Sequence, residues 1–265
     1  MSKSFRSPAK VMRRLTMAPS AAREVKNWGS FIYHYALGLV PQGTYNFRNG
    51  AHLKIGQGID HAPIIEVFLR REYGPIADGA VIVDLGASIG TFSVYAGTIA
   101  RKTTIYAYEP LPGFFDLLQE NLRLNRLDGT VRSINAAVAG APGERDLVVT
   151  GGKFYFPTLL HREGEAGTRS IRVPCTTLPD IIDAHGLTRI DLLKMDCEGS
   201  EYEILYAVSD SYLRRIAEIR LEYHNLDADQ CNRQGMAAFL RAKDYEICLT
   251  KENTPTNGIL WARRK

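Results

Sequence analysis

The chain has 265 residues, of which 45% are hydrophobic and 23% are charged. These values are close to those of an average globular protein, and they exclude a collagen-like or wholly disordered chain. No apolar run reaches the roughly 20 residues that a membrane-spanning helix requires, and the four cysteines form no CxxC pair. We therefore expect one large α/β domain with reduced thiols and a cytoplasmic location.

The net charge of +4 is concentrated at the N-terminus. Residues 1–30 contain seven Lys or Arg residues and a single acid, Glu24, so the rest of the chain is net acidic. Such a segment is usually a solvated tail, but it also suits peripheral contact with an anionic membrane, or an organellar transit peptide. We expect residues 1–43 to form a basic arm, helical over about 20–39, and residues 44–265 to form the main domain.

Along the chain, the pattern first predicts a small hairpin and then alternating strands and helices. Turn residues separate short β-like segments at 44–47 and 52–55, and apolar residues at helical spacing predict a helix over 62–73. Further strands are expected at 80–85, 104–108, 131–136, 190–195, 216–223, 245–250 and 259–262. Helices are expected at 91–100, 114–124, 177–185, 201–208 and 235–243. This alternation predicts a mostly parallel sheet covered on both faces, with an antiparallel strand from the terminal hairpin.

One stretch, residues 139–169, does not follow the alternation. It contains six glycines, one strand-like segment and the aromatic residues Phe154, Tyr155 and Phe156. A long insertion in a compact domain is usually functional or mobile, so we expect it to contribute to a substrate pocket or to a dimer interface.

A glycine-containing turn follows the first buried strand, in Asp84-Leu85-Gly86-Ala87-Ser88-Ile89-Gly90. Ligands of open α/β sheets bind at the carboxyl ends of strands, where glycine allows a tight turn. The G-x-G-x-x-G fingerprint of dinucleotide-binding proteins fails at two of its three positions, and the GxxxxGK[ST] phosphate loop is absent. The spacing suits a ligand with an amino-acid end, although an ordinary strand–helix turn remains the alternative.

Acidic residues end three further strands. Glu109 follows the second strand about 20 residues after the glycine turn, where a carboxylate can accept both hydroxyls of a ribose. Asp196 and Glu198 follow the strand at 190–195, and His224 ends the strand at 216–223 beside Glu222. Asp196 or His224 is the candidate general base, with Glu198 or Glu222 orienting it.

Two further interpretations concern these acids. Glu201 is expected to act in the first turn of the next helix, where acids are favourable. Carboxylates and an imidazole are plausible metal ligands, but no ligand spacing demands a metal and we expect none.

Several motifs together resemble the FkbM family of S-adenosylmethionine-dependent methyltransferases. They are VIVDLGASIGTFSVYAG, YAYEP, LLQENLRLN, IDLLKMDCEGSEYEIL and EIRLEYHN, spread over roughly residues 60–250, and LLKMDCEGSE is the most specific. The resemblance implies a Rossmann-like class I methyltransferase fold, with a seven-stranded, mostly parallel sheet whose last strand is antiparallel.

The resemblance also implies residue roles. Asp84, Gly86 and Gly90 would shape the methionine pocket of S-adenosylmethionine, with the backbone of Ala87 and Ser88 near it. Glu109 would hold the ribose, and Ala136 and Ala137 would lie by the adenine. Asp196 would lie near the reactive methyl group, with Glu198 and Gly199 at the rim.

The function implied is O-methylation of a hydroxyl on a small molecule, sugar or glycan. A catalytically silent cofactor-binding module and a nicotinamide-dependent oxidoreductase remain alternatives. A nucleic-acid methyltransferase has only the basic arm in its favour, so no nucleic-acid partner is expected. A homodimer is possible.

Overall fold

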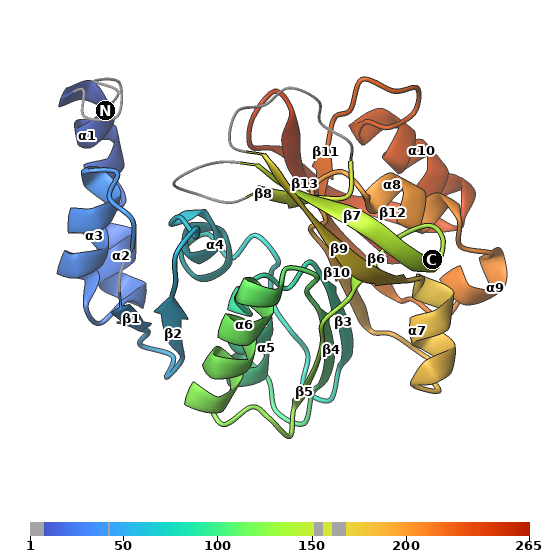
Figure 1. The fold of residues 1–265 in the computed structure, drawn as a ribbon, viewed down its shortest axis with the longest axis horizontal. Coiled ribbons are helices and arrows are strands. Elements are labelled where there is room, and N and C mark those ends of the chain that lie inside the picture. Colours follow the sequence, from blue (N-terminus) through green and yellow to red (C-terminus); the bar gives the residue numbers. More distant parts are fainter. Residues whose placement is uncertain (1–7, 42, 151–155, 161–167) are drawn as a thin grey trace.

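The computed structural model describes residues 8–41, 43–150, 156–160 and 168–265, and its centre is a seven-stranded sheet (Figure 1). The strand order is β12-β13-β11-β10-β3-β4-β5. The strands are β3 (Val81–Leu85), β4 (Thr104–Tyr108), β5 (Val131–Ile134), β10 (Leu192–Met195), β11 (Glu218–His224), β12 (Tyr245–Glu252) and β13 (Asn257–Arg264). Strands β5, β4, β3, β10 and β11 pair in parallel, whereas β13 is antiparallel to both its neighbours. The predicted seven-stranded sheet with an antiparallel last strand is confirmed.

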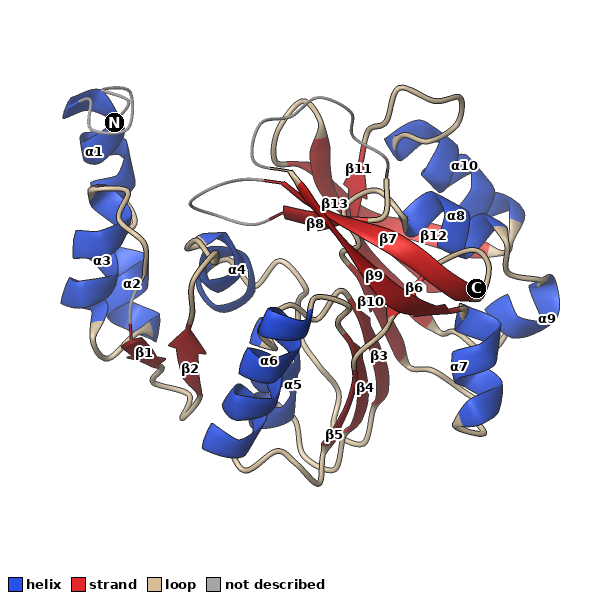
Figure 2. Cartoon of the chain, in the orientation of Figure 1, coloured by secondary structure: helices blue, strands red, loops and turns tan. Residues whose placement is uncertain are grey.

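Both faces of the central strands are buried, which explains their continuous apolar sequence. Alternate residues belong to different cores: Ile82 packs with one cluster, and Val83 packs with the other. The first cluster includes α5 (Thr91–Ile99) and α6 (Pro112–Leu124). The second includes α7 (Leu178–Ala184), α8 (Glu201–Tyr206), α9 (Asp210–Leu213) and α10 (Arg233–Ala242). Helices therefore cover the sheet on both sides, as Figure 2 shows.

The N-terminal segment is folded onto the body rather than solvated. It forms α1 (Pro8–Leu15), α2 (Ala18–Glu24) and α3 (Trp28–Ala36), followed by a hairpin of β1 (Gly43–Asn46) and β2 (His52–Ile55). The single helix expected over 20–39 is wrong, because Val25 forms an antiparallel bridge with Phe47. The Lys26 N–H also donates to the Asn46 carbonyl. Hydrogen bonds thus cross the boundary expected at residue 43.

The helix expected over 62–73 is shorter and wound differently. It consists of α4 (Ala62–Ile64) and a π-helical turn, η2 (Ile65–Leu69). The Arg70 N–H donates to the Ile65 carbonyl, five residues earlier, at 2.8 Å. Arg71 then takes a left-handed conformation with φ of 54°, which ends the helix before Tyr73.

The insertion belongs to a second sheet. The sequence pattern predicted only one strand in this region and no sheet. Its order is β6-β9-β7-β8. The strands are β6 (Ala137–Val138), β7 (Gly143–Thr150), β8 (Phe156–Thr158) and β9 (Arg169–Thr176). Phe154 and Tyr155 lie outside the described residues. The Thr158 hydroxyl donates to the Glu198 carbonyl at 2.9 Å, so this second sheet is anchored to the loop that follows β10.

Within the described ranges, no helix combines the length and the apolar character that crossing a membrane requires.

Candidate functional site

A cavity of about 420 Å³ lies at the carboxyl ends of β3, β4, β10 and β11. This volume is in the range of small-molecule and cofactor sites. Its wall combines the turns after these strands with residues of segment 58–73, of the insertion at 157–159 and of the turn before β13. Of the residues predicted for the site, those lining the cavity are Gly86, Ala87, Ser88, Glu109, Ala136, Ala137, Asp196, Glu198 and His224.

Gly86 is required where the first turn meets the loop after β10. Its φ is +73°, and a Cβ atom there would lie 1.9 Å from the backbone oxygen of Asp196. The N–H groups of Gly86 and Ala87 both donate to the Tyr108 carbonyl, at 3.1 and 2.9 Å. The cavity floor is therefore formed by direct backbone packing between turns that follow different strands.

Gly90 and Asp84 do not line the cavity. Gly90 has φ of +84° at the start of α5, where a Cβ would lie 2.5 Å from Leu118 Cδ1, so it allows α5 to pack on α6. Asp84 is fully buried and accepts a hydrogen bond from Ser93 Oγ at 2.7 Å. Its other oxygen forms a 3.0 Å ion pair with Lys194 Nζ. Both residues therefore support the residues that line the pocket without lining it themselves.

Lys194 is a lining residue that the sequence interpretation missed. Its ammonium group donates to the Gly86 carbonyl at 2.8 Å, next to its ion pair with Asp84. Burial alone would lower the pKa of Lys194, but the carboxylates of Asp84 and Asp196 outweigh burial and raise it. The available signal was a lysine inside an apolar strand, because such a charge is buried only when it is paired.

Glu109 is held by the backbone with part of its hydrogen-bonding capacity unused. One carboxylate oxygen accepts from the Ser88 N–H, and the other accepts from the Leu111 N–H, each at 2.8 Å. Burial raises its pKa to about 7, although these two hydrogen bonds act to lower it. A carboxylate offers about four lone-pair sites. Glu109 can therefore accept two further hydrogen bonds from a ligand in the cavity.

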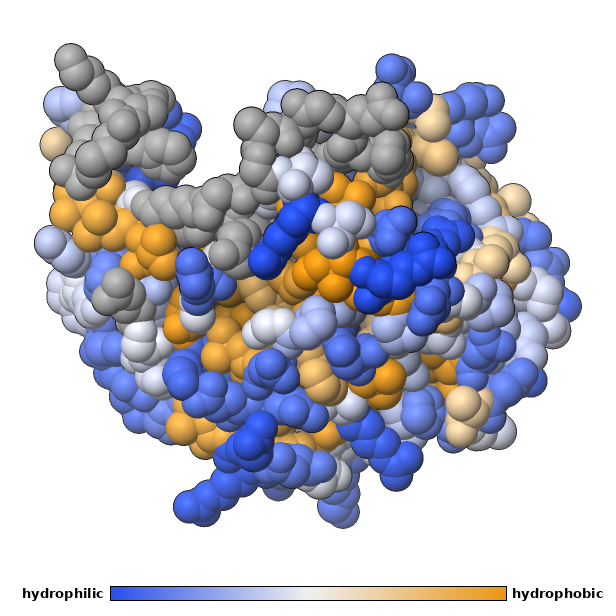
Figure 3. Space-filling model, in the orientation of Figure 1, coloured by the Kyte–Doolittle hydropathy of each residue, from blue (hydrophilic) through white to orange (hydrophobic). Residues whose placement is uncertain are grey.

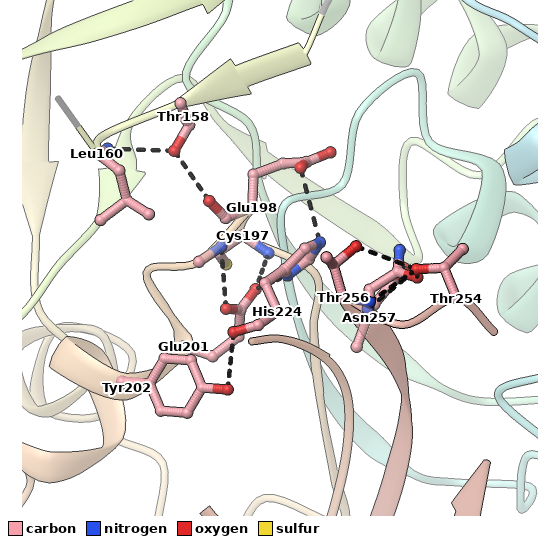
Figure 4. A network of polar contacts seen from close by, with 12 residues as sticks. Thr158, Leu160, Cys197, Glu198, Glu201, Tyr202, His224, Thr254, Thr256 and Asn257 are labelled. Carbon is pink, nitrogen blue, oxygen red and sulfur yellow. Dashed lines mark hydrogen bonds and ion pairs between the residues drawn. The ribbon is translucent and has the colours of Figure 1, made fainter. Parts of the chain in front are cut away.

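The loop after β10 folds around the buried carboxylate of Glu201 (Figure 4). One oxygen accepts from the Cys197 N–H at 2.7 Å, and the other accepts from the Gly199 N–H at 3.0 Å. Glu201 does begin α8, but its carboxylate also shapes the loop that carries Asp196 and Glu198. The sequence interpretation assigned it only the role in the helix.

His224 lies between two carboxylates. Its Nδ1 is 3.3 Å from Glu201 Oε1, and its Nε2 is 3.6 Å from Glu198 Oε2 (Figure 4). Among the described residues, Nδ1 has no partner with hydrogen-bond geometry, so its contact with Glu201 is an ion pair. Burial would lower the pKa of His224, but Glu201, Glu198 and Asp196 together raise it to about 10. The imidazole is therefore protonated at neutral pH and cannot accept a proton there.

Asp196 remains the better candidate base. Burial raises its pKa, while the nearby cations Lys194 and His224 act to lower it. Glu222 lines the same cavity and accepts a 2.6 Å hydrogen bond from Asn257 Nδ2. Burial, with the charges of Asp196 and Glu66, raises the pKa of Glu222 to about 10. Glu222 is therefore protonated at neutral pH, whereas the two cations beside Asp196 favour its ionised form.

Two more polar lining residues come from the segment before β3. Burial and the charges of Asp196, Glu72 and Asp60 raise the pKa of Glu66 to about 8. Tyr73 is 3% exposed, and its hydroxyl has no hydrogen-bond partner in the described residues. A buried hydroxyl without a partner at a cavity wall is suited to bind a ligand. The sequence signal for Glu66 and Tyr73 was their segment, EVFLRREYG, which also resembles the FkbM family.

Among residues 8–41, 43–150, 156–160 and 168–265, no three His, Cys, Asp or Glu side chains are placed to hold a metal ion together.

Comparison with known proteins gives consistent matches. A family model described as the methyltransferase FkbM domain matches residues 84–247. Methyltransferase sdnD of Sordaria araneosa is 28% identical in an alignment of 174 residues that covers 53% of this chain and 65% of sdnD. The 31-O-demethyl-FK506 methyltransferase FkbM of Streptomyces tacrolimicus is 28% identical in an alignment of 195 residues that covers 61% of this chain and 74% of that protein. Hexuronic acid methyltransferase AglP of Haloferax volcanii is 25% identical in an alignment of 148 residues that covers 54% of this chain and 56% of AglP. This chain thus spans less than two thirds of the lengths of sdnD and AglP.

Proposed function

This chain belongs to the FkbM methyltransferase family, and we propose that it transfers a methyl group from S-adenosylmethionine to a hydroxyl of a small molecule or sugar. The observed sheet fits the Rossmann-like class I methyltransferase fold expected from sequence. The family match favours this activity over the oxidoreductase and the silent module that sequence left open. A relative named for 31-O-demethyl-FK506 supports an oxygen acceptor, and a relative named for hexuronic acid supports a sugar-derived substrate.

The residues present fit the methyl donor. Glu109 has lone pairs left for the ribose hydroxyls. It lies in the cavity wall with Ala136 and Ala137, whose small side chains leave room for the adenine ring. The turn at Gly86 to Ser88 would take the amino-acid end. S-adenosylmethionine supplies an activated methyl group on a positively charged sulfur, and that charge would favour the ionised form of the acidic side chains in the cavity wall.

The protein's task is then to bind, orient and deprotonate the acceptor. An alcohol is a weak nucleophile, and a base that removes its proton typically contributes about 10²–10⁴-fold to the rate. We propose Asp196 as that base, because it lines the cavity and because the protonated His224 beside it favours its ionised form. Glu198 and Glu201 hold His224 in place, and Thr158 secures the Glu198 backbone.

The observation that carries the proposal is the cavity in which Glu109 and Asp196 converge from the ends of β4 and β10. It is tested by calorimetry with S-adenosylmethionine and by transfer of a labelled methyl group to a panel of sugars and alcohols. Asp196→Asn is expected to lower kcat by about 10²–10⁴-fold while donor affinity stays within about twofold. Absence of donor binding in the wild type would refute the methyltransferase assignment. Full turnover by Asp196→Asn would refute only the choice of base.

A cytoplasmic location remains part of this proposal and rests on the four free thiols.

A further inference from the structure

The N-terminal helices expose an unusual amount of apolar side chain. Met12 is 68% exposed, Tyr33 58%, Trp28 41% and Leu15 40%. In the described chain, only three other large hydrophobic residues are this exposed: Ile99, Leu124 and Leu249. We call Met12, Leu15, Trp28 and Tyr33, with the basic residues around them, the N-terminal surface. Figure 3 shows apolar surface beside hydrophilic surface at this end of the molecule.

These residues are exposed although the helices that carry them are packed. Phe31, Ile32 and Ala36 on α3 are buried, as is Ala21 on α2. The Arg14 guanidinium lies 5.4 Å from the centre of the Tyr35 ring, which ties α1 to α3. The inner faces of α2 and α3 therefore form core contacts, whereas α1 buries no residue of its own, and the exposed side chains are left for a partner.

The same surface carries a strong positive charge. In helices α1 to α3 and the links between them, Lys10, Arg13, Arg23 and Lys26 are exposed, whereas Arg14 packs on Tyr35, and the one acid is Glu24. Glu24 is already bound, since its carboxylate pairs with Arg23 at 3.1 Å and with Arg71 at 3.4 Å. Cations next to exposed Leu, Met and Trp are the composition by which proteins bind anionic bilayers.

We propose that the N-terminal surface docks on an anionic membrane, with Met12, Leu15 and Trp28 entering the headgroup region and the basic residues contacting lipid phosphates. A nucleic acid would use the positive charge but gain nothing from Met12 or Leu15, because its outer surface is phosphate. Apolar and charged groups at one surface supply the two signals that stable peripheral binding requires. The proposal does not depend on methyl transfer.

Cosedimentation with lipid vesicles tests it. The full chain is expected to bind vesicles of phosphatidylcholine with phosphatidylglycerol more tightly than pure phosphatidylcholine, and added salt should weaken the binding. Arg13→Ala with Lys26→Ala should weaken it about 30-fold, because each basic residue near an anionic bilayer contributes roughly a fivefold factor. Met12→Ser with Leu15→Ser should weaken it at least about tenfold.

Matched controls lie on other faces of the molecule. Ile99→Ser with Leu124→Ser removes apolar side chains that are 38% and 44% exposed, and Arg214→Ala with Lys265→Ala removes exposed positive charge. Both control pairs should bind vesicles like the wild type. The proposal is overturned if both vesicle types bind equally, if the controls lose as much binding as the N-terminal variants, or if those variants only convert a dimer to a monomer in light scattering.

Discussion

Replacing Gly86 by alanine tests how the cavity is built. A Cβ atom at Gly86 would lie 1.9 Å from the Asp196 backbone oxygen, and neither the turn nor the loop after β10 can move alone. The Lys194 ammonium donates to the Gly86 carbonyl, and the Asp196 N–H donates to the Leu85 carbonyl at 3.0 Å. The added methyl group must therefore push β3 and β10 apart at their carboxyl ends.

Gly79 provides the matched control. Its φ of +76° is nearly that of Gly86, but a Cβ atom there would meet nothing within 4 Å. Gly79→Ala should cost only the left-handed conformation, about 1–2 kcal/mol in the free energy of unfolding. Gly86→Ala adds steric overlap, which typically costs about 1–3 kcal/mol, so we expect a total of about 2–5 kcal/mol.

Urea denaturation measures both free energies of unfolding, and calorimetry with S-adenosylhomocysteine measures the ligand site. Gly86→Ala should lose ligand binding under conditions in which it is still folded, whereas Gly79→Ala should keep it. Equal stability and equal affinity in the two variants would show that the close backbone contact does not form the floor of the cavity.

Three other side chains give predictions from their protonation. The pKa of Glu109 is raised to about 7, and its ionised form is the better hydrogen-bond acceptor, so the affinity of the wild type for S-adenosylhomocysteine should increase as the pH rises through neutrality. In Glu109→Gln, calorimetry should find weaker binding that does not depend on pH in this way. The pKa of His224 is raised from 6.5 to about 10, so its ion pairs stabilise the fold fully below pH 6.5 and this contribution is lost as the pH rises toward 10. In urea denaturation, the difference in the free energy of unfolding between the wild type and His224→Gln should therefore become smaller over that range. A constant difference would contradict the pairing. Because Glu222 is protonated at neutral pH, its neutral isostere in Glu222→Gln should keep kcat within about threefold; a loss as large as that of Asp196→Asn would mean that Glu222 acts as a carboxylate.

The sheet could be predicted from sequence because burial on both faces of parallel strands leaves continuous apolar runs, as at 104–108. The prediction of one helix over 20–39 was wrong because Val25 forms a β-bridge with Phe47. The spacing of apolar residues along one segment contains no information about a bridge to a distant residue. The second sheet was missed for the same reason. Its β7 pairs with β9 across residues that include the undescribed segments, and its glycine-rich sequence has little periodicity.

For the site, the rule that parallel strands end at one edge was sufficient to bring Glu109, Asp196 and His224 to the same cavity. This rule applies only to residues that follow a strand. Lys194 lies within β10, so the rule did not place it in the cavity wall. Its partner depends on register: β10 pairs with β3 so that Lys194 lies opposite Asp84, and a shift by one residue would turn its side chain to the other face. The register depends on the packing of the whole sheet. The sequence alone therefore does not reveal that Lys194 and Asp84 form an ion pair.

The same dependence on register explains why the chemistry of Asp196 is not visible in its motif. Burial raises the pKa of Asp196, Lys194 near the end of β10 and His224 from β11 act to lower it, and the carboxylates of Glu201 and Asp84 act to raise it. His224 is in turn cationic only because Glu201 and Glu198 flank it. Each group separately is an ordinary acid or base, and only their convergence makes the histidine a fixed cation. A base must be free of its proton to act, and the pKa of His224 is raised to about 10, so we propose Asp196 as the base and His224 as the positive charge beside it.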